Sequence, residues 1–260
     1  MRTPSRSPTG EFPAVAADIL ERLRARAPRV HCITNTVAQA FTANMLLAAG
    51  AIPSMTIAPE EISAFVGSAG SLLVNLGTCD AQRRHAISLA LDAAGPGLPW
   101  VLDPVFVDRS PLRASFAVDL IARRPKAVRL NAVEFAALAG AEPDADALSR
   151  YAHEHGLVVA LSGRADRVTD GQRTAGLRNG HEWMARVTAM GCAGSALLAA
   201  CLAVEDDAWR AAVAALLILG IAGEVAAGRS NGPGSFAAAI LDAVHALDRA
   251  TLARHARVEA

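Results

Sequence analysis

A run of small residues that contains one cysteine is the part of the chain best suited to chemistry. Residues 187–195 read Val-Thr-Ala-Met-Gly-Cys-Ala-Gly-Ser and lead into residues 196–203, whose apolar composition is typical of a buried helix. Small residues at a helix start leave backbone N–H groups unpaired at the positive end of the helix dipole, where phosphate binds readily. The same field would favour the thiolate of Cys192, which could accept a proton. The alternative is a cysteine that only packs at a crowded helix start.

Polar residues also follow several short apolar runs that are predicted to be strands. Asp103 ends one run, Asn131 follows another with Glu134 three residues later, and Ser162 ends a third. In open parallel sheets, ligands bind beyond the carboxyl ends of the strands. Each carboxylate taken singly could instead cap a helix. Three polar strand ends together favour a shared site, which Cys192 would face if its helix packs beneath the sheet.

The elements that must position these side chains alternate between strands and helices. This alternation predicts an α/β fold with a parallel sheet and helices on both faces. Asp170 and Gly171 predict the turn of a hairpin across residues 167–174. The predicted strands are 30–33, 52–56, 72–76, 100–103, 127–130 and 157–161, and the predicted helices are 37–49, 60–67, 81–94, 116–122, 133–139, 145–155, 193–204, 208–227 and 234–253.

The composition narrows the class of protein. Hydrophobic residues make up 52% of the 260 residues and aromatic residues only 4%, so the core must be built from Ala, Val, Leu and Ile. The net charge of zero, without long basic runs, argues against a nucleic-acid partner. Four cysteines without a CxxC pair fit a reducing cytosol and a cytoplasmic protein. Residues 1–11 lack the apolar centre of a signal peptide, and the apolar run 211–222 is too short to cross a bilayer, so no membrane partner is expected.

Lys126 is the only lysine in the chain, and it follows a proline rather than a glycine-rich loop. The sequence therefore contains neither a P-loop nor the lysine signature of a protein kinase. If the protein handles nucleotide phosphates, backbone amides and arginine must hold them.

Eight separated motifs resemble, in order and spacing, those of the hydroxyethylthiazole kinase family, ribokinase-like enzymes of thiamine salvage. The motifs are Val-His-Cys-Ile-Thr-Asn (30–35), Phe-Thr-Ala-Asn (41–44), Val-Leu-Asp-Pro-Val (101–105), Arg-Leu-Asn-Ala-Val-Glu (129–134), Val-Thr-Asp-Gly (168–171), Asn-Gly-His (179–181), Gly-Cys (191–192) and Gly-Pro-Gly-Ser-Phe (232–236). Each motif alone is weak, and their shared order and spacing carry the resemblance.

The resemblance implies a ribokinase-like three-layer fold with a central, mostly parallel sheet and helices on both faces. A single kinase domain would span residues 28–255, after a tail and first helix in residues 1–27. The implied reaction is transfer of the γ-phosphoryl group of ATP to the hydroxyl group of 4-methyl-5-(2-hydroxyethyl)thiazole, with Mg²⁺ as cofactor. The resemblance also implies a homotrimer with its sites between subunits.

Seven positions of this sequence match functional positions of the family. The resemblance implies a catalytic base at Cys192, ATP-binding residues at Arg129 and Ser162, substrate-binding residues at Met55 and Ala189, and Mg²⁺-binding residues at Asp103 and Glu134. Phosphoryl transfer depends on positioning and charge neutralisation more than on a strong base, so a modest thiol base is chemically sensible.

The chain departs from the family in three places, of which the third, at Ser162, is a mild change. Ala189 and Met190 stand where the family usually has Gly-Thr, and an alanine would be strained there if its φ is positive. Residues 106–110 replace a Gly-Val-Gly-Ala-Thr loop and include Arg109. This arginine would either bind an ATP phosphate or face solvent beside Asp108.

The departures leave alternatives open for the function. The changed loop is compatible with a kinase of another small heteroaromatic alcohol, and a catalytically silent binding protein is a third possibility. A silent protein has no physical need for the full set of Asp103, Arg129, Glu134 and Cys192. At Ser162, where the family usually has threonine, the hydroxyl group is kept.

Overall fold

The short apolar runs form one sheet in the computed structural model, which describes residues 11–259. The strand order is β2-β1-β3-β4-β5-β6-β7-β8-β9. Strands β1 to β6 pair in parallel, and β7, β8 and β9 continue the sheet in antiparallel fashion. The strands are β1 (Arg29–Ile33), β2 (Ile52–Ser54), β3 (Ser71–Asn75), β4 (Trp100–Asp103), β5 (Ala127–Asn131), β6 (Val158–Ser162), β7 (Asp166–Thr169), β8 (Thr174–Leu177) and β9 (Val258–Glu259).

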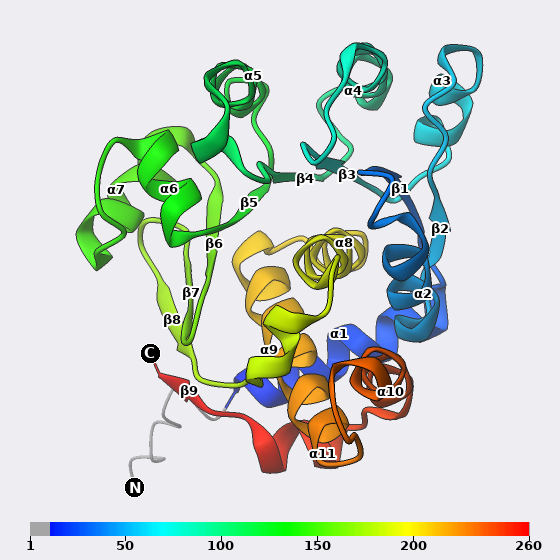
Figure 1. Cartoon of the computed structure of the whole chain (residues 1–260), viewed down its shortest axis with the longest axis vertical. Coiled ribbons are helices and arrows are strands. Elements are labelled where there is room, and N and C mark those ends of the chain that lie inside the picture. The colour runs from blue at the N-terminus through cyan, green and yellow to red at the C-terminus, as the bar shows by residue number, and fades with distance from the viewer. Residues whose placement is uncertain (1–10, 260) are drawn as a thin grey trace, which may run out of the picture.

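Helices cover both faces of this sheet, which confirms the predicted three-layer α/β fold (Figure 1). One layer contains α3 (Pro59–Gly67), α4 (Ala81–Ala94), α5 (Pro111–Ile121), α6 (Ala132–Ala139) and α7 (Ala145–His155). The other contains α1 (Phe12–Arg26), α2 (Gln39–Ala49), α8 (Met190–Leu202), α9 (Ala208–Ala227), α10 (Pro233–Ala246) and α11 (Arg249–His255). Each layer has its own cluster of buried apolar side chains against the sheet.

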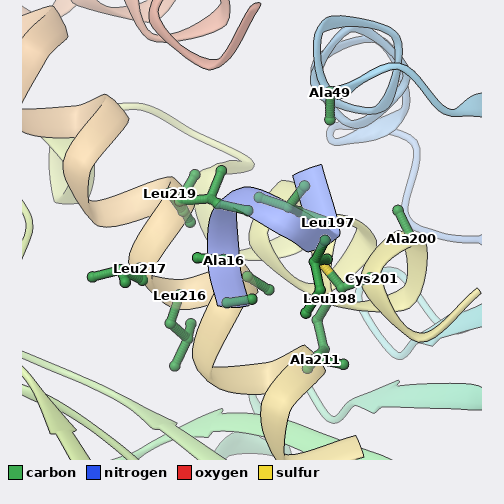
Figure 2. Close-up of a cluster of buried hydrophobic side chains, with 14 of the residues drawn as sticks. Ala16, Ala49, Leu197, Leu198, Ala200, Cys201, Ala211, Leu216, Leu217 and Leu219 are labelled. Carbon is green, nitrogen blue, oxygen red and sulfur yellow. The ribbon is translucent and has the colours of Figure 1, made fainter. Parts of the chain in front are cut away.

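The second layer is built around α8 and α9. Figure 2 shows Leu197 and Leu198 of α8 close to α9 and to Ala16 of α1. Small side chains such as Ala200 let the helices approach closely, as the composition predicted. Because α8 is buried along most of its length, its first turn is held in a fixed position relative to the sheet.

Among the described residues, α9 alone is long and apolar enough to cross a membrane by length and composition. The apolar run at 211–222 is too short to cross a bilayer, but the helix around it has 20 residues. Most of α9 is buried, and it packs against α1, α8 and α10. Its apolar character is therefore that of a core helix.

The predicted hairpin is confirmed, because β7 and β8 pair antiparallel with Thr169 opposite Thr174 and Gly171 at a φ of 90°. The prediction of one helix over 234–253 is wrong. That segment breaks into α10 and α11, since Asp248 caps the second helix by accepting a hydrogen bond from Thr251 N at 2.7 Å. A second cap, Ser110, starts α5 at Pro111, five residues before the predicted start.

Candidate active site

A cavity of about 720 Å³ lies beyond the carboxyl ends of the parallel strands. Its wall includes residues that follow β1, β3 and β4 and residues at the ends of β5 and β6, together with the first turn of α8. Six of the seven predicted site residues line it: Asp103, Arg129, Glu134, Ser162, Ala189 and Cys192. The prediction that the polar strand ends and the start of α8 lie close together is therefore confirmed. The role of each residue stays a prediction.

Met55 is the predicted site residue that the single chain does not bring to this cavity. It follows β2, the edge strand of the sheet, and packs partly buried against the core cluster of the α8–α9 layer. A substrate in the cavity of the same chain would therefore not touch Met55.

The first turn of α8 is an anion-binding arrangement. The first helical hydrogen bond runs from Ala193 N to Ala189 O at 2.9 Å, so the amides of Gly191 and Cys192 come before it and have no carbonyl partner in the helix. Ala189 precedes the helix with φ 68° and ψ 0°, in the left-handed region. The sequence predicted strain at Ala189 if its φ is positive, and the φ is positive. For a residue with a Cβ this conformation costs about 1–2 kcal/mol.

Cys192 is the third residue of α8 rather than part of the turn before it. Its sulfur accepts a hydrogen bond from Asn35 Nδ2 at 3.3 Å. Burial raises the pKa of the Cys192 thiol to about 11, and the negative charge of Asp103 acts in the same direction. The expectation of a favoured thiolate is therefore wrong, because desolvation has the largest influence on this pKa and favours the neutral thiol.

Asp103 ends β4 and is held by two donors on one oxygen. Asn75 Nδ2 and Ser195 Oγ each donate to Asp103 Oδ2 at 2.8 Å. Burial raises the pKa of Asp103 to about 6, opposed by Arg129 and reinforced by Glu134. Two buried carboxylates and two arginines, Arg113 and Arg129, thus line one cavity.

Glu134 forms a capping box with Asn131 at the start of α6. Asn131 Oδ1 accepts from Glu134 N at 3.0 Å, and Glu134 Oε2 accepts from Asn131 N at 3.0 Å. Glu134 Oε1 accepts from Phe106 N at 2.9 Å, which ties the loop after β4 to α6. The helix-capping alternative is therefore realised for Glu134, although the same carboxylate also faces the cavity.

Arg129 projects from β5 across the first turn of α8. Its Nη1 donates to Gly191 O at 3.0 Å, while its Nε is buried with no hydrogen-bond partner among residues 11–259. Gly194 makes room for this side chain, because a Cβ there would lie 3.3 Å from Arg129 Nε and 2.8 Å from a Leu219 methyl group. Ser162 ends β6 beside it and donates to Leu130 O at 3.3 Å.

The loop that departs from the family lies at the cavity edge. Phe106 has a φ of 56°, lines the cavity and is 59% exposed. Arg109 does not line the cavity; its Nε pairs with Asp108 Oδ2 at 2.7 Å and its side chain is 79% exposed. Of the two alternatives for Arg109, the solvent-facing arginine is the one observed. Together, Ala189 and residues 106–110 are called the rim below.

Several polar residues of the site were not singled out from the sequence. One is Arg113, which lines the cavity and whose Nη1 donates to Val105 O at 2.6 Å, and three others belong to a buried hydrogen-bond network. Asn35 follows β1, Asn75 ends β3, and Ser195 lies in α8 one turn after Gly191. With Asp103 and Cys192 they form a hydrogen-bonded network in and directly beneath the cavity wall, called the floor network below. The available signal was the same as for Asp103, since Asn75 directly follows the apolar run Leu72 to Val74.

The mostly parallel sheet with helices on both faces, and a strand-end cavity with free helix-start amides, an arginine and carboxylates, define a phosphotransferase of ribokinase-like fold. A ribokinase-like superfamily protein from Enterococcus faecalis has a similar structure, with a TM-score of 0.66 at 13% identity over 94% of this chain and 90% of that one. The model of the hydroxyethylthiazole kinase family matches residues 20–250. The chain belongs to the hydroxyethylthiazole kinase family.

Individual relatives agree with this assignment. The chain is 46% identical to a probable hydroxyethylthiazole kinase of Agrobacterium fabrum, over 96% of this chain and 98% of the relative. It is 43% identical to the hydroxyethylthiazole kinase of Cronobacter sakazakii, over 89% of this chain and 92% of the relative. The structure of the Pyrococcus horikoshii hydroxyethylthiazole kinase protein superposes with a TM-score of 0.91 at 35% identity, covering 95% of this chain and 98% of that one.

Proposed function

We propose that the protein transfers the γ-phosphoryl group of ATP to the hydroxyl group of 4-methyl-5-(2-hydroxyethyl)thiazole, in the cytoplasm and as a step of thiamine salvage. The observation that carries the proposal is the meeting of free helix-start amides, a guanidinium and two carboxylates in one cavity. Amides and arginine stabilise the charge on a transferring phosphoryl group, and carboxylates bind the accompanying cation. A cavity of about 720 Å³ is within the range of small-molecule sites.

Arg129 and Ser162 would bind ATP from the ends of β5 and β6. Arg129 already reaches the first turn of α8, so its guanidinium and the amides of Gly191 and Cys192 would face the same phosphate. Its buried Nε lacks a partner among the described residues, and a phosphate oxygen would supply one. A planar guanidinium suits phosphate oxygens better than an ammonium group does, which agrees with an active site without lysine.

The carboxylates of Asp103 and Glu134 fit a magnesium ion. Mg²⁺ is commonly bound by one or two carboxylates, substrate phosphates and water, and no cluster of three or more His, Cys, Asp or Glu residues occurs within residues 11–259. Asp103 would be the direct ligand, because among the described residues its Oδ1 accepts no hydrogen bond. Both oxygens of Glu134 accept backbone amides, so it would act through the waters of the ion. Bound Mg²⁺ would neutralise the phosphate charge during transfer.

Cys192 would orient the acceptor hydroxyl rather than remove its proton. A thiol with a pKa of about 11 is almost fully protonated at neutral pH, so it is a poor base. A loose phosphoryl-transfer transition state needs little help from a base. As the acceptor oxygen bonds to the γ-phosphorus, the bond from that phosphorus to the oxygen bridging the β- and γ-phosphates breaks and ADP leaves. The hydroxyl proton leaves late, to an oxygen of the transferred phosphoryl group.

Met55 would take part in substrate binding if subunits assemble. Exposed apolar side chains gather around the β2 edge of the sheet, and Val37, Leu47, Ile52 and Phe65 are each at least 40% exposed. Burying such side chains against another copy stabilises an oligomer. In the proposed homotrimer, Met55 of one subunit would contact the thiazole in the cavity of its neighbour.

The test of the proposed function is a panel of acceptor alcohols. ADP release is measured with ATP and Mg²⁺ in the presence of hydroxyethylthiazole, a pyridine alcohol, or no acceptor. We expect rapid release and a phosphorylated thiazole only with the first compound. Preference for the other alcohol would identify a kinase of a different heteroaromatic alcohol, and ATP binding without turnover on any acceptor would identify a silent binding protein.

A further inference from the structure

Asn75 has no solvent contact and does not line the cavity, yet it holds two residues that do. Its Nδ2 donates to Asp103 Oδ2 at 2.8 Å. Its Oδ1 accepts from Asn35 Nδ2 and from Gly77 N, each at 3.0 Å. The side chain is 0% exposed and lies at the end of β3, where the sheet register places Asn75 beside Asp103. It therefore connects the strand ends of β1, β3 and β4.

The orientation of each amide in this chain of hydrogen bonds is fixed by a backbone N–H group. Gly77 N can only donate, so Asn75 must turn its oxygen toward Gly77 and its nitrogen toward Asp103. Ala38 N donates to Asn35 Oδ1 at 3.0 Å, so the nitrogen of Asn35 faces Asn75 and Cys192. A flip of either amide would place two donors or two acceptors against each other.

We propose that Asn75 is a positioning residue for phosphoryl transfer, which holds Asn35 in the orientation that donates to the Cys192 sulfur and holds Asp103 by a single oxygen. The inference rests on the proposed function. Because the Cys192 sulfur accepts the hydrogen bond from Asn35, its own S–H group is free to donate to a group in the cavity. Because Asn75 and Ser195 both use Oδ2, the other oxygen of Asp103 remains for the cation.

The consequence is an effect on turnover rather than on substrate affinity. Asn75 touches neither the cavity nor a ligand in it, so its loss removes no binding contact. Ala38 N still holds Asn35 and Ser195 Oγ still holds Asp103 in its absence, but each side chain loses one of its polar contacts and can shift. Small misplacements of reacting groups slow a reaction by up to about 100-fold. An Asn75→Leu variant should therefore lose about 10- to 100-fold in kcat, with KM for ATP and for the thiazole changed by less than about threefold.

A second variant disturbs the contact between Asn75 and Asn35 by displacing Asn35 instead of replacing Asn75. A Cβ on Gly77 would lie 2.7 Å from Asn35 Nδ2, so an alanine at this position must displace the Asn35 amide. The hydrogen bond from Asn75 to Asp103 involves neither Gly77 nor Asn35. Gly77→Ala should lower kcat in the same direction, even if Asn75→Leu folds poorly. The matched control is Ser71→Ala, which removes a fully buried hydroxyl that has no hydrogen-bond partner within residues 11–259, at the other end of the same strand. It should leave kcat and KM unchanged.

The experiment combines steady-state kinetics, thermal unfolding and crystal structures of the wild type and both variants. The expected result is a loss of kcat with a displaced Asn35 in each variant. The proposal is overturned if the variants keep wild-type kcat while the melting temperature falls. It is also overturned if kcat falls while Asn35 keeps its contact with Cys192 and Asp103 keeps its wild-type position. An inactive wild type would instead overturn the proposed function, and with it the catalytic meaning of Asn75.

Discussion

The floor network and the rim are two parts of one cavity that are built in opposite ways. On the floor, Asn35, Asn75 and Ser195 are buried, and their hydrogen bonds connect residues from β1, β3, β4 and α8. On the rim, Phe106 and Ala189 hold left-handed backbone conformations without being glycine. Ala189 and the loop 106–110, two of the places where the sequence departs from the pattern expected of the family, form the rim.

The difference indicates where each kind of substitution is tolerated. A strained rim residue costs free energy locally, and the rest of the fold can offset about 1–2 kcal/mol. A floor residue is shared by several elements, so its replacement leaves other buried polar groups without partners, and each such group is costly. Floor variants should therefore alter turnover, and rim variants should mainly alter stability.

The largest effect is expected for Asp103. An Asp103→Asn variant keeps the shape of the side chain but loses the charge that would hold Mg²⁺, so turnover should fall at least about 100-fold. Titration of activity with Mg²⁺ measures the change, and Asp80→Asn, which alters a helix cap outside the cavity, is the matched control. Unchanged turnover with a large loss of stability would make Asp103 a structural residue only.

Glu134 is predicted to affect both folding and magnesium use. In Glu134→Gln, one of the two oxygens that accept Phe106 N and Asn131 N becomes a donor, so one of these hydrogen bonds is lost. The free energy of unfolding should fall by about 1–2 kcal/mol, and the Mg²⁺ concentration for half-maximal activity should rise. Urea unfolding measures the first effect. Asp144→Ala removes the side-chain cap of α7 away from the cavity, so it should lower the free energy of unfolding by about 0.5–2 kcal/mol without changing the Mg²⁺ requirement.

Cys192 should contribute less than a general base would. Because its thiol is protonated at neutral pH, Cys192→Ala should lower turnover about tenfold, below the range of about 10²–10⁴ expected for a positioned base. Alkylation of Cys192, followed by mass spectrometry, should accelerate about tenfold per pH unit from pH 7 to 9.5, since the thiolate fraction rises toward a pKa of about 11. An alkylation rate that levels off below pH 8 would mean that Cys192 is already mostly thiolate there, as the helix start suggested.

The sequence was sufficient for the features that depend on local chemistry. Asp170 and Gly171 predicted a hairpin that is present, and the apolar runs predicted the parallel strands whose ends form the cavity. The two-residue strand β9 and the break before α11 were missed. The first is too short to show a pattern, although Asp248 could have been recognised as a helix cap.

The features that the sequence did not predict depend on burial and on distant contacts. The helix start indicated a thiolate at Cys192, but the degree of burial that raises its pKa exists only in the packed structure. The role of Asn75 depends on contacts to residues 40 positions before it and 28 positions after it. No local pattern encodes such contacts.

The smallest expected effect tests the strain on the rim. Ala189→Gly and Phe106→Gly should each raise the free energy of unfolding by about 0.5–1 kcal/mol, because glycine adopts a positive φ without a Cβ clash while the unfolded chain gains some freedom. Little burial is lost at Phe106, whose side chain is mostly in solvent. Arg109→Ala removes only an exposed ion pair, so it is the matched control and should change stability by less than about 0.5 kcal/mol. Urea unfolding of the four proteins measures these differences. If Phe106→Gly is destabilising by more than about 1 kcal/mol, the ring packs the cavity edge and the contrast between floor and rim is wrong.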